Sequence, residues 1–112
     1  MDCIFCKIAA GEIPSTKVYE DDTVVAFNDL DPQAPVHVLI IPKEHIASAA
    51  EINESNSAVV AHIFEVAAKI AAEKGLKDGF RIVNNCGDSA RQSVKHLHFH
   101  LMGRRDFGWP AG

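Results

Sequence analysis

Three histidines alternate with apolar residues near the end of the chain, in the run His96-Leu97-His98-Phe99-His100-Leu101-Met102. Because successive side chains of a strand point to opposite faces of a sheet, a strand over this run places the imidazoles on one face and the apolar side chains on the other. Imidazole titrates close to neutral pH and can serve as a ligand, a base or a nucleophile. The alternation therefore predicts a strand with one core face and one chemical face, in preference to histidines that simply face water.

The loop before this run carries groups that can bind phosphate oxygens. Asn85, Gln92 and Ser93 supply donors, and Gly87 leaves room for an anion to approach the backbone. Phosphoryl and nucleotidyl transfer need such donors, and an imidazole nucleophile suits attack on phosphorus because it is partly unprotonated at neutral pH. His37 joins this site if its strand pairs with the histidine strand; taken alone, it fits a buried core histidine equally well.

A second group of chemically active residues begins with Cys3 and Cys6. Two thiolates at this spacing form half of a tetrahedral zinc site, and no βαβ unit surrounds them to favour a redox role. His45 and His96 are available to complete the site, but their separation from the cysteines matches no zinc finger. Spacing alone thus leaves zinc and free structural thiols equally favoured, and Cys86 is interpreted as a free thiol.

Composition excludes several classes of protein. The chain has 112 residues, a net charge of −4 and no basic stripe, which argues against binding to duplex nucleic acid. Its length and its hydrophobic content of 47% suit a single domain over residues 1–112. No apolar run comes close to about 18 residues, the length that a membrane-spanning helix needs. The three cysteines, and a start without the features of a signal peptide, lead us to expect a cytoplasmic protein with no membrane partner.

The elements that must position these residues follow from periodicity and turn signals. Strands are expected over 18–20, 23–27, 36–41 and 80–84, besides the histidine run. Helical spacing of apolar residues predicts one long helix over 53–74, capped by Asn53 or Ser55 and followed by Gly75. With a short apolar helix over 4–9, we predict an α+β domain with a five-stranded, mostly antiparallel sheet, one long helix and one short N-terminal helix.

The His-x-His-x-His pattern resembles the signature of the histidine-triad (HIT) family of nucleotide hydrolases and transferases. Further segments resemble the branch called histidine-triad nucleotide-binding proteins, namely 28–43, 81–85, 92–94 and 109–110. The resemblance covers essentially the whole chain. It implies a HIT-like fold and a homodimer in which the C-terminal tail lies near the active site of the neighbouring subunit.

The same resemblance implies roles for individual residues. His98 matches the nucleophile, His100 and His37 match its partners, and Ser93 matches a group near the leaving group. Asp29 matches the carboxylate that receives the ribose hydroxyls. The implied nucleotide-binding residues are Phe5, Phe27, Asp29, Leu30, Asn85, Gln92, Ser93, His98 and His100.

The resemblance also bears on the cysteines. Many bacterial members, and the related galactose-1-phosphate uridylyltransferases, carry Cys-x-x-Cys with two histidines as a structural zinc site. The matching metal ligands are Cys3, Cys6, His45 and His96, so His96 is implied to be structural rather than catalytic. The chain departs from the family in two places: animal members of the branch lack the cysteine pair, and Arg91 stands where a glycine is common, which can alter leaving-group preference.

Together these inferences favour a purine nucleoside phosphoramidase-like hydrolase with no organic cofactor. Its substrates would be AMP or GMP derivatives with a P–N bond or a mixed anhydride, cleaved through a nucleotidyl-His98 intermediate. The alternatives are a dinucleoside polyphosphate hydrolase of the same family and a nucleotide-binding adaptor with slow hydrolysis; a non-enzymatic zinc module is more distant. Phe107 and Trp109 in the tail favour burial against a second copy, with packing on their own domain as the alternative.

Overall fold

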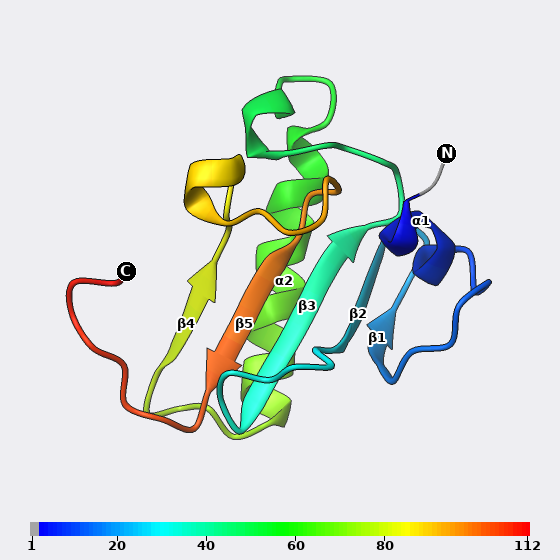
Figure 1. Cartoon of the computed structure of the whole chain (residues 1–112). Coiled ribbons are helices and arrows are strands. Elements are labelled where there is room, and N and C mark those ends of the chain that lie inside the picture. The colour runs from blue at the N-terminus through cyan, green and yellow to red at the C-terminus, as the bar shows by residue number, and fades with distance from the viewer. Residues whose placement is uncertain (1–2) are drawn as a thin grey trace.

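A five-stranded antiparallel sheet forms the centre of the molecule in this computed structural model, which describes residues 3–112 (Figure 1). The strand order is β1-β2-β3-β5-β4. The strands are β1 (Lys17–Glu20), β2 (Val24–Asn28), β3 (Val36–Pro42), β4 (Phe80–Val83) and β5 (Phe99–Gly103). The helices are α1 (Ile4–Ala9) and α2 (Ser57–Glu73), with short 3-10 turns at Ala49–Glu51 and Asp88–Ala90. The predicted α+β class, sheet and two helices are confirmed.

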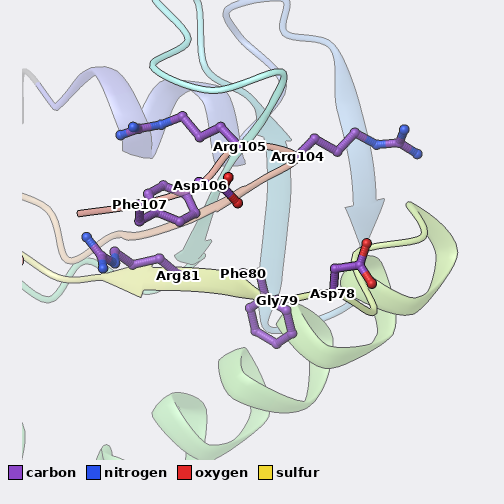
Figure 2. Close-up of a pocket in the computed structure, with 8 residues that line it drawn as sticks. All are labelled: Asp78, Gly79, Phe80, Arg81, Arg104, Arg105, Asp106 and Phe107. Carbon is purple, nitrogen blue, oxygen red and sulfur yellow. The ribbon is translucent and has the colours of Figure 1, made fainter. Parts of the chain in front are cut away.

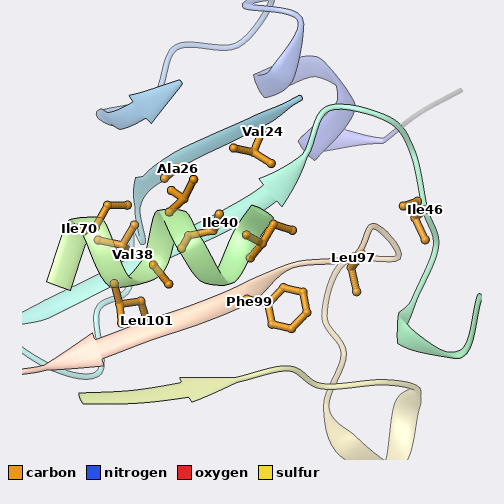
Figure 3. Packing of buried hydrophobic residues seen from close by; sticks show 12 residues of the cluster. Val24, Ala26, Val38, Ile40, Ile46, Ile70, Leu97, Phe99 and Leu101 are labelled. Carbon is orange, nitrogen blue, oxygen red and sulfur yellow. The ribbon is translucent and has the colours of Figure 1, made fainter. Parts of the chain in front are cut away.

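The two helices cover opposite faces of the sheet (Figure 1). On β3, Val38 and Ile40 pack toward α2, whereas Leu39 and Ile41 pack toward α1. This alternation explains why the strand is apolar almost throughout, because both of its faces are buried. Figure 3 shows the cluster on the α2 side, which includes Val24, Ala26, Val38, Ile40, Ile46, Ile70, Leu97, Phe99 and Leu101.

Helix α2 is shorter at its start than the sequence predicted. The side chain of Asn53 accepts bonds from the backbone N–H of Ser55 at 2.8 Å and from its hydroxyl at 2.6 Å, which fixes a turn before the helix. Neither residue therefore caps the helix; the cap position is Asn56, whose side chain makes no capping bond. At the other end, Gly75 has φ +71° as predicted, a conformation that glycine adopts without strain.

The histidine strand is also shorter than predicted. β5 starts at Phe99, so His96 and His98 lie in irregular chain before it. The pairing of β5 begins where Ile40 meets Phe99 on one side and Val83 meets His100 on the other. Before that point the chain bonds to a loop instead, through the N–H of Leu97 and the carbonyl of Ile46 at 2.6 Å. The predicted alternation nevertheless holds, because Leu97, Phe99 and Leu101 all enter the core beside α2.

The remaining boundaries differ by a residue or two. β3 extends past the expected end at residue 41 and includes Pro42, which pairs with Val24. The hairpin turn between β1 and β2 is held by Asp21, whose side chain accepts from the N–H groups of Thr23 and Val24 at 2.9 and 3.0 Å. Within residues 3–112, neither helix combines the length and the apolar character needed to cross a membrane.

Candidate active site and metal centre

Two cysteines and two histidines meet beside the start of α1. Cys3 precedes the helix and its sulfur accepts from the N–H of Cys6 at 3.3 Å, so that both sulfurs lie on one side of the turn. The Cys3 sulfur lies 3.3 Å from Nδ1 of His96, and the Cys6 sulfur lies 3.3 Å from Nδ1 of His45. The two Nδ1 atoms are 3.2 Å apart. All four ligand atoms lie within 4.8 Å of one another, which confirms the predicted metal cluster.

This geometry fits a tetrahedral metal ion. Bond lengths of about 2.3 Å to sulfur and about 2.0 Å to nitrogen place neighbouring ligands of a tetrahedral zinc roughly 3.3–3.8 Å apart. The other ring nitrogen of His96, Nε2, donates to the carbonyl of Pro42 at 2.8 Å, which leaves the Nδ1 lone pair for a metal. Burial lowers the pKa of His96 and keeps the ring in the neutral form that a metal requires.

The second histidine cluster is held by its own chain of hydrogen bonds. The backbone N–H of Gln33 donates to Nδ1 of His37 at 2.9 Å, so the ring proton of His37 resides on Nε2. That Nε2 lies 2.9 Å from Nδ1 of His100 and 3.4 Å from a carboxylate oxygen of Asp29. His100 therefore accepts on Nδ1 and carries its own proton on Nε2. The pairing of β3 with β5 brings these histidines together, as the sequence predicted.

His98 presents the opposite nitrogen from His96. Its Nδ1 lies 2.7 Å from the backbone carbonyl of His96, to which it donates its proton. The lone pair of His98 is thereby placed on Nε2. The ring packs edge-on against Phe5 and His100, with centroid distances of 5.1 and 5.2 Å. A buried, oriented imidazole with a free lone pair is equipped to attack an electrophile.

The neighbouring imidazoles are kept neutral by their surroundings. Burial, reinforced by His98 and His37, lowers the pKa of His100 to about 4. Burial also lowers the pKa of His37, against the opposing effect of the Asp29 carboxylate. Asp29, His37 and His100 bring three ligand-type atoms within 4.8 Å, but the Gln33 bond leaves a proton on the His37 nitrogen that would have to bind a cation. The cluster is therefore suited to proton and phosphate chemistry rather than to metal binding.

An apolar cavity of about 260 Å³ opens beside Asp29. Its walls include Phe5, Ile8, Ile13, Phe27 and Leu39, and its lining also includes Asp29, Ser93 and Leu30. Leu30 lies at the rim and is 99% exposed, unlike the buried phenyl rings of Phe5 and Phe27. An apolar cavity with a carboxylate at its edge is complementary to a nucleoside, whose base is flat and mostly apolar and whose ribose carries hydroxyl groups.

The loop before β5 differs in detail from the sequence-based interpretation. The Gln92 side chain is buried and fully engaged, accepting from the N–H of Gly87 at 2.9 Å and donating to the carbonyls of Ala47 and Val94 at 2.7 and 3.0 Å. It braces the loop, and direct contact with a phosphate stays a prediction. Arg91 adopts φ +67° and is exposed; its backbone N–H donates to the carbonyl of Asp88 at 3.0 Å, and its side chain has no hydrogen-bond or ion-pair partner among residues 3–112. The roles expected for Ser93 and Asn85 likewise stay predictions.

Another hollow lies away from both clusters. A cavity of about 560 Å³ is lined by residues 78–81 and 104–107, at the β4 edge of the sheet (Figure 2). The guanidinium groups of Arg81 and Arg105 lie 4.8 and 4.5 Å from the Phe107 ring centroid. Arg81 also donates to the carbonyl of Gly108 at 2.9 Å. This hollow therefore anchors the start of the C-terminal tail, whereas Trp109 beyond it is 86% exposed.

Sequence reasoning missed the backbone and amide groups that orient the imidazoles. These are the Pro42 carbonyl, the Gln33 N–H and the side chain of Asn84, which donates to the carbonyl of His98 at 3.0 Å. The first two are main-chain groups, which carry no residue-type signal. Asn84 offered one, because its polar amide directly follows strand β4.

Comparison with known proteins agrees with this geometry. A family model described as "Scavenger mRNA decapping enzyme C-term binding" matches residues 2–108. The 14 kDa zinc-binding protein of Zea mays is 48% identical over 111 residues, covering 97% of this chain and 87% of that protein. A solved HIT family hydrolase from Legionella pneumophila Philadelphia 1 has a TM-score of 0.97 at 48% identity, covering 99% of this chain and 100% of that one.

A histidine triad nucleotide-binding protein from Candida albicans has a TM-score of 0.86 at 38% identity, covering 99% of this chain and 85% of that one. These matches extend over nearly the whole chain and confirm the HIT-like fold expected from the sequence. Proteins named as hydrolases and as nucleotide-binding proteins both occur among them. The chain therefore belongs to the histidine-triad family.

Proposed function

We propose that the protein is a hydrolase of purine nucleoside 5′-phosphoramidates and related adenylates, with His98 as the nucleophile. The observation that carries the proposal is the bond from Nδ1 of His98 to the carbonyl of His96, at 2.7 Å. It fixes the tautomer and leaves the Nε2 lone pair available. A lone pair on a positioned imidazole is what attack on phosphorus requires.

The surroundings of His98 support a nucleotide substrate. The apolar cavity receives the purine, and Asp29 at its edge receives the ribose hydroxyls. Ser93 lines the same cavity, where its hydroxyl can meet the phosphate or the leaving group. His100 is neutral near pH 7, with a pKa of about 4, and offers its Nε2–H to a phosphoryl oxygen.

The reaction runs in two balanced steps. Nε2 of His98 forms a bond to phosphorus while the P–N bond of the substrate breaks, and the amine leaves with a proton taken from solvent. Water then attacks the same phosphorus and returns a proton to solvent, the P–Nε2 bond breaks, and a nucleoside monophosphate departs with His98 restored. The intermediate carries a positive charge shared over the ring, which the His96 carbonyl stabilises through the Nδ1 proton.

We propose zinc as the ion of the metal centre, with a structural role. The Cys2His2 donor set and its spacing support zinc, as does the name of the Zea mays relative. With all four positions taken by protein ligands, the ion leaves no site for substrate. It instead ties the start of α1 to the segment that carries His96 and His98.

The test of the nucleophile is trapping of the intermediate. Labelled adenosine phosphoramidate mixed with the protein and quenched in milliseconds should leave label on His98. His98→Ala should lose the label and lower turnover by about 10⁴-fold or more, because covalent catalysis depends on the attacking atom. AMP binding should persist in this variant. Turnover close to that of the wild type would refute the mechanism.

Hydrolysis of dinucleoside polyphosphates is the second candidate. The match to a decapping-enzyme family model favours it, because an mRNA cap is itself two nucleosides joined through a polyphosphate. The two candidates share the nucleophile and differ in the leaving group. Comparing kcat/KM for adenosine phosphoramidate with kcat/KM for diadenosine polyphosphates separates the two candidate activities. If the protein binds both compounds and turns over neither, the result favours a nucleotide-binding adaptor.

We also propose a cytoplasmic homodimer that pairs through α2 and the β4 edge. Phe64 on α2 and Phe80 on β4 are 47% and 43% exposed, and pairing would cover them together with the open edge strand. The tail passes this edge (Figure 1), so that it can reach the site of the second copy.

The tail proposal is tested by deleting residues 109–112, which leaves the Arg81 contact to Gly108 intact. Selectivity among leaving groups should change by about tenfold, the range of one modest contact, while AMP affinity stays the same. Light scattering supplies the control for assembly. An active monomer at micromolar concentration would contradict the dimer, and unchanged selectivity would contradict the role of the tail.

A further inference from the structure

One charged side chain stands without a partner in the loop that carries the proposed phosphate donors. Arg91 is exposed, and its guanidinium has no hydrogen-bond or ion-pair partner among residues 3–112. Asp88 is the carboxylate closest to it in the sequence, but Nζ of Lys95 already donates to Asp88 at 2.5 Å. The positive charge of Arg91 is therefore available to a ligand.

The backbone at Arg91 has an unusual conformation. Its φ of +67° and ψ of +38° lie in the left-handed region, which residues with a Cβ rarely adopt. The N–H of Arg91 closes the turn Asp88–Ala90 by donating to the carbonyl of Asp88 at 3.0 Å. Residues in such conformations persist where the surrounding structure fixes them, and they gather at active sites and ligand-binding loops.

The next two residues connect Arg91 to the proposed active site. Gln92 is 5% exposed and its side chain bonds to three backbone groups, which fixes the position of the loop. Ser93 lines the apolar cavity, and two residues of chain span at most about 7 Å. The loop lies at the end of the sheet where β5 begins, directly after His98 (Figure 1). The long side chain of Arg91 can therefore extend to a group that leaves from phosphorus there.

We propose that Arg91 is a specificity-determining residue, which binds an anionic group carried by the leaving group of the substrate. This inference deepens the proposed function and rests on it, because it requires attack by His98 beside this loop. A guanidinium binds carboxylate or phosphate oxygens through two parallel N–H donors. The preferred substrates are then nucleoside phosphoramidates whose amine carries a carboxylate, or polyphosphates.

Two substrates that differ in one charge test the proposal, namely the adenosine 5′-phosphoramidates of glycine and of glycinamide. The readout is the ratio of kcat/KM for the glycine compound to kcat/KM for the glycinamide compound. Arg91→Gln should lower this ratio about fivefold from its wild-type value, the effect of one exposed ion pair. Arg91→Lys should keep part of the preference. In the wild type the ratio should fall in about 1 M salt, which screens exposed charges beyond roughly 3 Å.

Lys77→Gln is a matched control, because it makes the same change in charge at the other end of β5. Lys77 is exposed and follows Leu76, which packs on Gly103 at the last position of that strand. Its substitution should leave the ratio unchanged. Arg91→Gly should lower the ratio as Arg91→Gln does, with a melting temperature no lower than that of the wild type, because glycine adopts the left-handed conformation without strain.

Diadenosine triphosphate distinguishes the two sources of the anionic group. If Arg91→Gln lowers kcat/KM for this compound about fivefold and leaves the glycine ratio unchanged, the group that Arg91 binds is a phosphate. If the glycine ratio alone falls, the group is a carboxylate. Both results support the proposal.

The remaining outcomes separate this inference from the function on which it rests. If His98→Ala is inactive and Arg91→Gln changes neither measurement, the role of Arg91 is refuted and the nucleophile stands. An equal fall of the ratio in Lys77→Gln also refutes the role of Arg91, because net charge would then be the cause. If His98→Ala retains activity, both proposals fail together.

Discussion

His96 and His98 are two residues apart in one motif, yet they use opposite ring nitrogens. His96 donates from Nε2 to the Pro42 carbonyl and turns Nδ1 toward the cysteines. His98 donates from Nδ1 to the His96 carbonyl and leaves Nε2 free. In each case a backbone carbonyl accepts a hydrogen bond from one ring N–H. The other ring nitrogen is then available for a ligand or an electrophile.

The difference shows that residue type does not settle the role of a histidine. Both rings are buried, at 0% and 3% exposure, and both lie in the same irregular segment before β5. What separates them is the carbonyl that each ring meets. The side chain of His96 points into the cluster of cysteines and histidines, whereas its carbonyl orients the ring of His98, so His96 links the two clusters.

The sharpest way to break this comparison is to replace each histidine in turn. His96→Ala removes one of four metal ligands, and we expect the zinc content to fall from about one per chain. The melting temperature should drop by roughly 10 °C or more, because loss of a structural metal costs on the order of 4 kcal/mol. His98→Ala should keep both zinc and stability and lose turnover.

Chelation supplies the control for that comparison. Removing the metal from the wild-type protein should reproduce the loss of stability, and Cys6→Ser should make the protein insensitive to the chelator. A metal-free protein that is fully active and as stable as before would show that the cysteines only pack. The two histidines would then differ in orientation without differing in role.

Much of this contrast was visible in the sequence. The alternation of histidines with Leu97, Phe99 and Leu101 predicted a core face and a chemical face, and all three apolar residues are in the core. The resemblance to the histidine-triad family assigned His96 to the metal, whereas spacing alone could not, because His45 and His96 come from segments far from the cysteines. Only the pairing of strands and the position of α1 bring these four side chains together.

The parts that could not be predicted depend on local hydrogen bonds. The chain before β5 bonds to the loop at Ile46 instead of to β3, which continues to Pro42, and the start of α2 is set by the turn at Asn53. Gln92 reads as a phosphate donor in the sequence, yet its amide bonds to three backbone groups. A polar residue type indicates that hydrogen bonds will form, but it does not indicate which group the side chain will bond to.

A smaller effect, the dependence of stability on pH, extends the comparison to His62 and His100, whose rings have different partners. His62 on α2 lies between two carboxylates, with Nε2 at 2.6 Å from Asp21 and Nδ1 at 3.1 Å from Glu65. The bond to Asp21, with that to Glu65, raises the pKa of His62, whereas burial lowers that of His100 to about 4. The two rings therefore couple folding to pH with opposite signs.

For His62, the stabilisation is complete below the ordinary pKa of 6.5 and is lost as pH rises through the higher folded value. For His100, it is complete above pH 6.5 and is lost as pH falls toward about 4. His62→Gln should thus cost about 0.5–1 kcal/mol near pH 5.5, the worth of a partly exposed ion pair, and almost nothing near pH 9. Thermal melts of both proteins across this range measure the difference, and NMR titration should find His100 neutral down to about pH 4. A destabilisation by His62→Gln that stays constant or grows with pH would contradict the assigned sign, and would mean that His62 contributes through packing on α2 rather than through its charge.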